Sequence, residues 1–147
     1  MLLINRFFTA VALVVLASTL VATAEDKERD KETCSNSSLR GSFGLRATGN
    51  TTTGGALIVL GRFSFDGEGN LTAKLYTRTP TGSNVLDTYT GTYSVDAECI
   101  VTDFWRSDTT GSVTTHVSVL VNNRKGYYVL NTTEGAPVII SGEATKQ

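Results

Sequence analysis

Apolar and polar residues alternate along most of the chain after residue 38, and turn residues interrupt the alternation at regular intervals. In residues 39–48, for example, leucine, phenylalanine and alanine occupy one face, whereas arginine, serine and threonine occupy most of the other. A period of two is typical of a β-strand that buries one face. The pattern predicts eight strands, over residues 39–48, 56–65, 71–78, 85–95, 99–106, 112–121, 126–131 and 137–145.

Eight consecutive strands joined by short turns indicate an all-β, antiparallel fold. Such strands either stack as two sheets or close into a barrel. Closure removes exposed sheet edges and needs only hairpin connections, whereas a sandwich usually needs longer crossovers. The short turns therefore favour a single eight-stranded up-and-down barrel. The interior of a barrel of this size is either filled by side chains or holds one small ligand.

The N-terminal segment has the three-part layout of a secretory signal peptide. A single arginine precedes an apolar run over residues 7–21, and small residues follow at positions 22–24. The run is shorter than the roughly 20 residues that cross a bilayer. We therefore predict a signal peptide over 1–24, a charged disordered leader over 25–33 and a barrel domain over 34–147. The mature protein is expected to be secreted or periplasmic, with no membrane association after cleavage.

The charge balance argues against two classes of partner. The chain carries 13 basic and 14 acidic residues, so it has no excess of positive charge. Proteins that bind nucleic acids depend on neutralising phosphates, and proteins held on anionic membranes depend on basic clusters. Neither nucleic acid nor a membrane surface is therefore expected as a partner.

The two cysteines, Cys34 and Cys99, are predicted to form a disulfide, because paired cysteines in an exported chain usually do. On the chain-entropy account, closing so long a loop contributes about 4 kcal/mol to stability. The alternative is two separate reactive thiols, although a redox pair would more often be spaced C-x-x-C.

Three segments resemble a known group of proteins: CSNSSLRGSFG (34–44), RFSFDGEGN (62–70) and TGTYSVDAEC (90–99). They are similar to small exported proteins, mostly bacterial, with a barrel like that of allene oxide cyclase and the wider calycin group. Members usually continue past the second cysteine with Thr-Gly, whereas this chain has Ile100-Val101. The resemblance implies a barrel and assigns no activity. Its relatives include cofactor-free cyclases, but no catalytic motif of theirs matches this chain.

The strand register decides which charged residues face the barrel interior. In residues 99–106, a one-residue choice places either Arg106 or Asp103 inside. In residues 137–145, the same choice concerns Glu143. Both alternatives remain open at this stage.

A buried carboxylate beside phenols would suit a proton-transferring isomerase or cyclase. Asp103 and Glu143 are the candidate acids, and Tyr89 and Tyr93 are the candidate phenols. The alternative is that every charge faces water, because expelling a charge from the interior costs less.

The leading functional hypothesis is a barrel that binds a small apolar or aromatic molecule without a cofactor. The alternatives are a cofactor-free isomerase or cyclase of allene oxide cyclase type, and a structural or interaction protein with a filled barrel. Outward Tyr76, Trp105, Leu120 or Tyr128 could support a homo-oligomer. Alternation selects as ligand-lining residues Phe43, Leu45, Phe63, Phe65, Leu75, Tyr89, Tyr93, Phe104, Val117 and Val119.

Other candidate chemistry is sparse. His116, the single histidine, shares a face with Thr114 and Ser118 opposite a row of valines, so it is predicted to lie on the surface. With both cysteines paired, no metal site is expected. The glycines of DGEGN (66–70) indicate a hairpin turn. Four glycosylation sequons, which matter only in a eukaryotic host, begin at Asn36, Asn50, Asn70 and Asn131.

Overall fold

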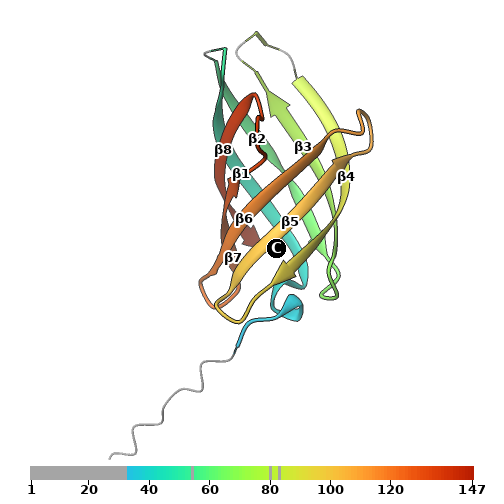
Figure 1. Cartoon of the computed structure of the whole chain (residues 1–147), viewed down its shortest axis with the longest axis vertical. Helices are drawn as coiled ribbons and strands as arrows, with labels where there is room; N and C mark the ends of the chain where they lie inside the picture. Colours follow the sequence, from blue (N-terminus) through green and yellow to red (C-terminus); the bar gives the residue numbers. More distant parts are fainter. Residues whose placement is uncertain (1–32, 54, 80, 83) are drawn as a thin grey trace, which may run out of the picture. The chain divides into compact units, whose positions relative to one another are not determined.

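Eight antiparallel strands pair in chain order and close into a barrel in the computed structural model (Figure 1). The structure describes residues 33–147 except 54, 80 and 83, so the predicted signal peptide and nearly all of the charged leader lie outside the described residues. The strands are β1 (Gly41–Thr51), β2 (Ala56–Phe65), β3 (Asn70–Arg78), β4 (Asn84–Val95), β5 (Ile100–Ser107), β6 (Val113–Val121), β7 (Gly126–Asn131) and β8 (Val138–Lys146).

The barrel closes where β8 pairs with β1. Leu45 lies opposite Ala144 and Ala47 lies opposite Gly142, so small residues on β8 face the interior at this seam. The predicted all-β fold with eight up-and-down strands is confirmed. One detail differs, because Leu39 belongs to a short 3-10 helix, η1 (Asn36–Leu39), and not to the first strand.

An aromatic cluster fills the end of the barrel that η1 covers. The ring of Phe65 lies 5.7 Å from that of Phe43, 5.1 Å from that of Tyr93 and 5.9 Å from that of Tyr127. Leu39 of η1 is only 1% exposed and belongs to the same core. Burial of large aromatic side chains of this kind dominates core stability. This end of the barrel is therefore closed by packing.

Hydrogen bonds fix η1 to the barrel end. The hydroxyl of Tyr93 donates to the carbonyl of Asn36, and the Oδ1 of Asn36 accepts from the backbone N–H of Val95. The predicted disulfide between Cys34 and Cys99 is also confirmed, with the two Cα atoms 5.0 Å apart. It joins the segment before η1 to the turn between β4 and β5.

The turn between β2 and β3 is the hairpin that the sequence predicts. The Oδ1 atom of Asp66 accepts hydrogen bonds from the backbone N–H groups of Glu68, Gly69 and Asn70. Gly67 and Gly69 both have positive φ, which residues with a side chain rarely adopt. The side-chain amide of Asn70, with these backbone bonds, lowers the pKa of Asp66 to about 2.

Within the described part of the chain, no helix has the length and apolar character needed to cross a membrane.

Candidate functional site

The inward side chains of the barrel form two unlike walls. The inward positions of β1, β2, β3 and β8 are almost entirely apolar, as the alternation predicts. The opposite wall, formed by β4 to β7, carries most of the polar groups of the interior, and we call it the polar wall. Its members are Asp87, Tyr89, Asp103, Trp105, Ser107, Thr114, His116, Ser118 and Asn131.

A cavity of about 180 Å³ lies between the two walls. It occupies the half of the barrel away from η1, since its lining includes Thr77, Ser112 and Val138 near the strand ends that lie opposite the 3-10 helix. The barrel is therefore not filled by side chains throughout. The full lining is Leu45, Ala47, Val59, Leu75, Thr77, Tyr89, Trp105, Ser112, Thr114, His116, Val129, Asn131, Val138 and Ile140.

A directional chain of hydrogen bonds runs through the polar wall. The backbone N–H of Thr133 donates to Oδ1 of Asn131 at 3.2 Å, which places the amide nitrogen of Asn131 toward His116. That nitrogen lies 3.2 Å from Nε2 of His116 and donates to it. The imidazole proton is therefore on Nδ1, which lies 2.9 Å from Oδ1 of Asp103 and donates to it. The network assigns one tautomer and one ring orientation to His116.

The predicted surface position of His116 is wrong, since the residue is only 5% exposed. Strand β6 directs Thr114, His116 and Ser118 inward and its valines outward. The physical reason is cross-strand pairing, because His116 lies directly opposite Asp103 in the ladder. A buried carboxylate and imidazole that bond to each other can be accommodated where either alone would be expensive.

The register of β5 settles the first open choice. Val101, Asp103 and Trp105 face inward, whereas Phe104 is 41% exposed and faces outward with Arg106. The predicted inward orientation of Phe104 is therefore wrong, and so is that of Val117 and Val119 on β6. Of the remaining predicted lining residues, Leu45, Leu75 and Tyr89 line the cavity. Phe43, Phe63, Phe65 and Tyr93 are buried in the core without lining it.

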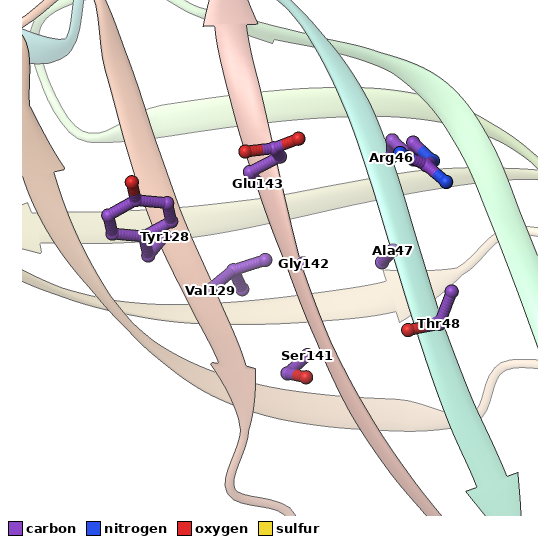
Figure 2. Close-up of a pocket in the computed structure, with 8 residues that line it drawn as sticks. All are labelled: Arg46, Ala47, Thr48, Tyr128, Val129, Ser141, Gly142 and Glu143. Carbon is purple, nitrogen blue, oxygen red and sulfur yellow. The ribbon is translucent and has the colours of Figure 1, made fainter.

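The second open choice has the opposite outcome, because Glu143 is exposed on the outer face of β8. Glu143 lines a depression of about 480 Å³ on the outer surface of β1, β7 and β8. Figure 2 shows its side chain on β8. Arg46 and Tyr128 flank it there. The hypothesis of a buried Glu143 beside the interior tyrosines is therefore wrong. Of the two candidate acids, Asp103 is the buried one, and Asp87 on β4 is a second buried acid that the sequence analysis did not select.

Two of the four residues proposed for an outer interface are also corrected. Trp105 and Leu120 are buried, whereas Tyr76 and Tyr128 are exposed as expected. Trp105 faces inward because the register that buries Asp103 also buries every second residue of β5.

Burial and hydrogen bonds together shift the pKa values of the polar wall. It raises the pKa of Asp103, and the hydrogen bond from His116 opposes that rise only in part. For Asp87, burial also acts to raise the pKa, but hydrogen bonds from Ser107 and Thr109 outweigh it and lower the pKa. Burial, with the nearby charge of Asp87, raises the pKa of Tyr89 to about 12. Tyr89 therefore remains a neutral phenol at physiological pH.

Trp105 stands at the centre of the polar wall. Its ring stacks on the imidazole of His116 with centroids 3.6 Å apart, and it contacts Phe63 from another side at 4.6 Å. As a hydrogen-bond donor toward Asp103, the indole opposes the rise in the pKa of that carboxyl, although the geometry of its Nε1–H falls short of a well-formed hydrogen bond.

Three buried polar atoms make no hydrogen bond in the part of the chain that the structure describes, namely Nε1 of Trp105, Oγ1 of Thr114 and Oγ of Ser118. An unsatisfied buried polar group costs about 1–3 kcal/mol. Trp105 and Thr114 also line the cavity. Groups of this kind are unusual in folded proteins and call for an explanation at the site where they occur.

The sequon asparagines differ in their surroundings. Asn50 and Asn70 are exposed. Asn131 is half-buried, and both ends of its amide are used in the chain that holds His116. The amide of Asn36 is likewise engaged at both ends. Glycosylation stays a prediction at all four positions. It would disturb these bonds at Asn36 and Asn131, and at Asn70 it would disturb the bond from the side-chain amide to Asp66.

No group of three or more histidine, cysteine, aspartate or glutamate side chains in the described residues is arranged to hold a metal ion.

Comparison with known proteins supports the fold and assigns no function. The sequence matches no family profile and no curated protein. A solved structure from the de novo design of transmembrane β-barrels is similar, with a TM-score of 0.59, 11% identity and coverage of 72% of this chain and 94% of that chain. The redesigned barrel mFAP0 bound to DFHBI has a TM-score of 0.54 and 13% identity, and the match covers 74% of this chain and 99% of that chain. The redesigned barrel mFAP1 bound to DFHBI has a TM-score of 0.53 and 13% identity, and the match covers 76% of this chain and 97% of that chain.

These identities are too low to carry more than architecture. The fold and the site together define an eight-stranded antiparallel barrel with an internal cavity that has one apolar and one polar wall. The resemblance to allene oxide cyclase-like proteins stays a prediction.

Proposed function

We propose that this protein binds a small aromatic molecule inside its barrel. The observation that carries the proposal is the cavity of about 180 Å³ between the apolar wall and the polar wall. Binding sites for small molecules are typically apolar concavities with a few convergent polar groups. The similar designed barrels mFAP0 and mFAP1 were solved with DFHBI bound, which supports the idea that a barrel of this size can hold a small molecule.

The cavity volume limits the size of the ligand. Drug-sized ligands occupy pockets of about 300 to 1,000 Å³, whereas an apolar cavity of about 150 Å³ holds benzene. At about 180 Å³, the cavity accommodates a single substituted ring. The indole of Trp105 and the phenol of Tyr89 supply aromatic surface for edge or face contacts with it.

The test fills the cavity and measures binding. Val138 lines the cavity, and its neighbour Ile139 is exposed on the outer face of the same strand. We expect Val138→Trp to weaken the binding of toluene at least tenfold in an NMR titration, and Ile139→Trp to leave it unchanged. Native mass spectrometry of the protein purified from its own host would also detect a co-purifying molecule. Equal toluene affinity in both variants would contradict the proposal.

A second candidate function is cofactor-free proton transfer. The observation that favours it is that His116, which lines the cavity, is hydrogen-bonded to the buried Asp103. Nε2 of His116 would remove a proton from a carbon beside a carbonyl and return it elsewhere on the same molecule, so no co-reactant is needed. Asp103 would hold the ring and stabilise the imidazolium. Because Nε2 accepts from Asn131, the substrate would have to take the place of that amide.

Deuterium exchange separates this activity from simple binding. In D₂O, the wild type is expected to accelerate loss of the methyl proton signal of acetophenone by about 10²-fold or more over buffer. His116→Gln should abolish the acceleration, and Asp103→Asn should reduce it. If acetophenone binds but its methyl protons exchange only at the rate seen in buffer, the protein binds the molecule without catalysing proton transfer.

We also propose that the protein acts outside the cytosol, as the predicted signal peptide suggests. The disulfide supports an oxidising compartment, because disulfides rarely persist in the cytosol. N-terminal sequencing of the protein recovered from its host tests this, since cleavage after residue 24 would leave Glu25 as the first residue.

A further inference from the structure

Two cations lie directly opposite each other on the outer face of the barrel. Arg62 on β2 and Lys74 on β3 are direct partners in the ladder, and both side chains are exposed. Like charges at directly opposed positions destabilise a sheet. Neither cation forms an ion pair with a carboxylate in the described part of the chain, although the guanidinium of Arg62 donates a hydrogen bond to the hydroxyl of Ser42. An external anion would therefore relieve the repulsion within this pair.

The pair belongs to a wider separation of charge on the barrel surface. At the exposed positions of the described strands, the acidic residue is Glu143 and the basic residues are Arg46, Arg62, Lys74, Arg78, Arg106 and Lys146. All charged residues of β2 and β3 are basic. The formal net charge of the chain is only −1, so its composition conceals a surface that attracts anions.

Arg62 and Lys74 line a depression of about 510 Å³ on the outer surface of β2, β3 and β4. The lining also contains the carboxylate of Asp108, which accepts a hydrogen bond from the hydroxyl of Thr90 at 3.2 Å. The hydroxyl-bearing residues of the lining are Ser64, Thr72, Thr88 and Thr90. Positive charge, hydroxyl groups and one carboxylate are thus brought together on one concave surface.

An exposed aromatic ring lies next to the two cations. Tyr76 follows Lys74 by two residues, so both point outward from β3, and Tyr76 is 55% exposed. Its ladder partners, Leu60 on β2 and Leu86 on β4, are also exposed. A phenol ring in this position offers apolar surface to the C–H face of a sugar ring.

The mixture of groups narrows the class of ligand. The carboxylate of Asp108 repels a dense polyanion but accepts hydrogen bonds from sugar hydroxyls. Closure of the barrel leaves no free strand edge among the described strands, so a peptide cannot add to the sheet through its backbone. A flat lipid surface does not reach into a concave site. A sugar chain that carries single carboxylates among many hydroxyls matches these groups.

We propose that this outer depression binds a polysaccharide built from carboxylated sugars. A carboxylate of the sugar chain lies between Arg62 and Lys74, a sugar hydroxyl donates to Asp108, and a neighbouring ring packs on Tyr76. The inference does not depend on the proposed function, because the depression lies on the outer face and the cavity lies inside the barrel.

The experiment compares hexagalacturonate with four other probes in calorimetric titrations at pH 7 and low ionic strength. Maltohexaose keeps the sugar without the charge, hexaglutamate keeps the charge without the sugar, and a heparin hexasaccharide raises the charge density. Phosphatidylglycerol vesicles test a lipid surface. The variants are Arg62→Gln, Lys74→Gln and Tyr76→Ala. Lys125→Gln, at an exposed position in the turn between β6 and β7, is the matched control.

We expect hexagalacturonate to bind most tightly, and Arg62→Gln and Lys74→Gln each to weaken it about fivefold to tenfold, as for loss of one hydrogen bond. Tyr76→Ala should also weaken it, and Lys125→Gln should leave it unchanged. All four positions are exposed, so the variants should fold, which thermal unfolding checks. The inference is overturned if hexagalacturonate does not bind, if any other probe binds more tightly, or if Lys74→Gln and Lys125→Gln have equal effects. None of these outcomes bears on binding inside the barrel.

Discussion

Asp103 on β5 and His116 on β6 are direct ladder partners, and their side chains meet inside the barrel with Oδ1 and Nδ1 2.9 Å apart. The pair explains why β6 turns a row of valines outward and its polar residues inward. Each residue makes burial of the other tolerable, and Asn131 completes the chain from the next strand.

Replacing one member of this pair should cost more than replacing both. In His116→Phe, Asp103 stays buried without its donor, and we expect unfolding free energy to fall by about 3–5 kcal/mol. Adding Asp103→Leu to that variant should recover part of the loss, because no unpaired buried charge remains. Urea denaturation of the wild type, both single variants and the double variant gives the coupling energy. Additive losses would show that the two side chains do not depend on each other.

Asp103 also gives the fold a specific pH dependence. Burial raises the pKa of this carboxyl in the folded state, so the unfolded chain loses its proton at lower pH than the folded chain does. The stabilising contribution of Asp103 is therefore fully present below its unfolded pKa of about 3.9 and is lost as pH rises through the folded pKa. Asp103→Asn cannot titrate, so its stability relative to the wild type should improve as pH rises from about 4 to 7. A constant difference across that range would contradict the raised pKa.

Much of the fold follows from the sequence because a barrel strand needs only a period of two and a turn at each end. The strands and the Asp66 turn were predictable in this way, and the disulfide was predictable because paired cysteines in an exported chain usually form one. The rule fails on β6, where both faces carry β-branched residues and the more apolar one faces out. Side-chain hydrophobicity alone favours the wrong register for this strand.

The site could be predicted only in part, because it depends on which residues oppose each other across strands. The sequence did contain one signal. Thr114, His116 and Ser118 place a polar residue at every second position and therefore on one face of their strand. On the preceding strand, Asp103 and Trp105 are two positions apart and also share a face. Recognising that His116 and Asp103 satisfy each other would have required the ladder offset between β5 and β6. That offset is set by the length of the intervening turn and by the closure of the whole barrel.

Gly142 on β8 should not tolerate a larger residue, because β8 packs closely against β1 at this position. A Cβ added there would overlap with Cβ of Ala47 and with the carbonyl oxygen of Arg46, so the two strands would have to separate. We expect Gly142→Ala to lower the free energy of unfolding by about 1–3 kcal/mol. Gly44→Ala is the matched control on β1, since the nearest atoms to its Cβ would belong to the flexible side chain of Gln147. Equal urea midpoints for the two variants would show that the seam is not tightly packed.

Loss of the disulfide should destabilise the η1 end of the barrel more than the cavity end. Cys34→Ser with Cys99→Ser removes the link that joins the segment before η1 to the turn between β4 and β5. We expect a loss of about 2–4 kcal/mol in unfolding free energy. Amide hydrogen exchange should accelerate first at Val95, whose N–H is held by Asn36 of η1. Uniform acceleration over all strands would instead indicate that the disulfide stabilises the barrel only as a whole.

The turn at Asp66 should make the protein sensitive to acid in a narrow range. Hydrogen bonds from Asn70 and from backbone N–H groups lower the pKa of Asp66 to about 2, whereas the unfolded chain has an ordinary aspartate near 3.9. The folded state therefore binds fewer protons than the unfolded state between these values. Its advantage is complete above about pH 4 and is lost as pH falls toward 2. Asp66→Asn keeps an oxygen acceptor for the turn but cannot titrate, so its Tm should fall less steeply than that of the wild type between pH 4 and 2. Parallel Tm curves for the two proteins would show that the charge of Asp66 does not hold the turn.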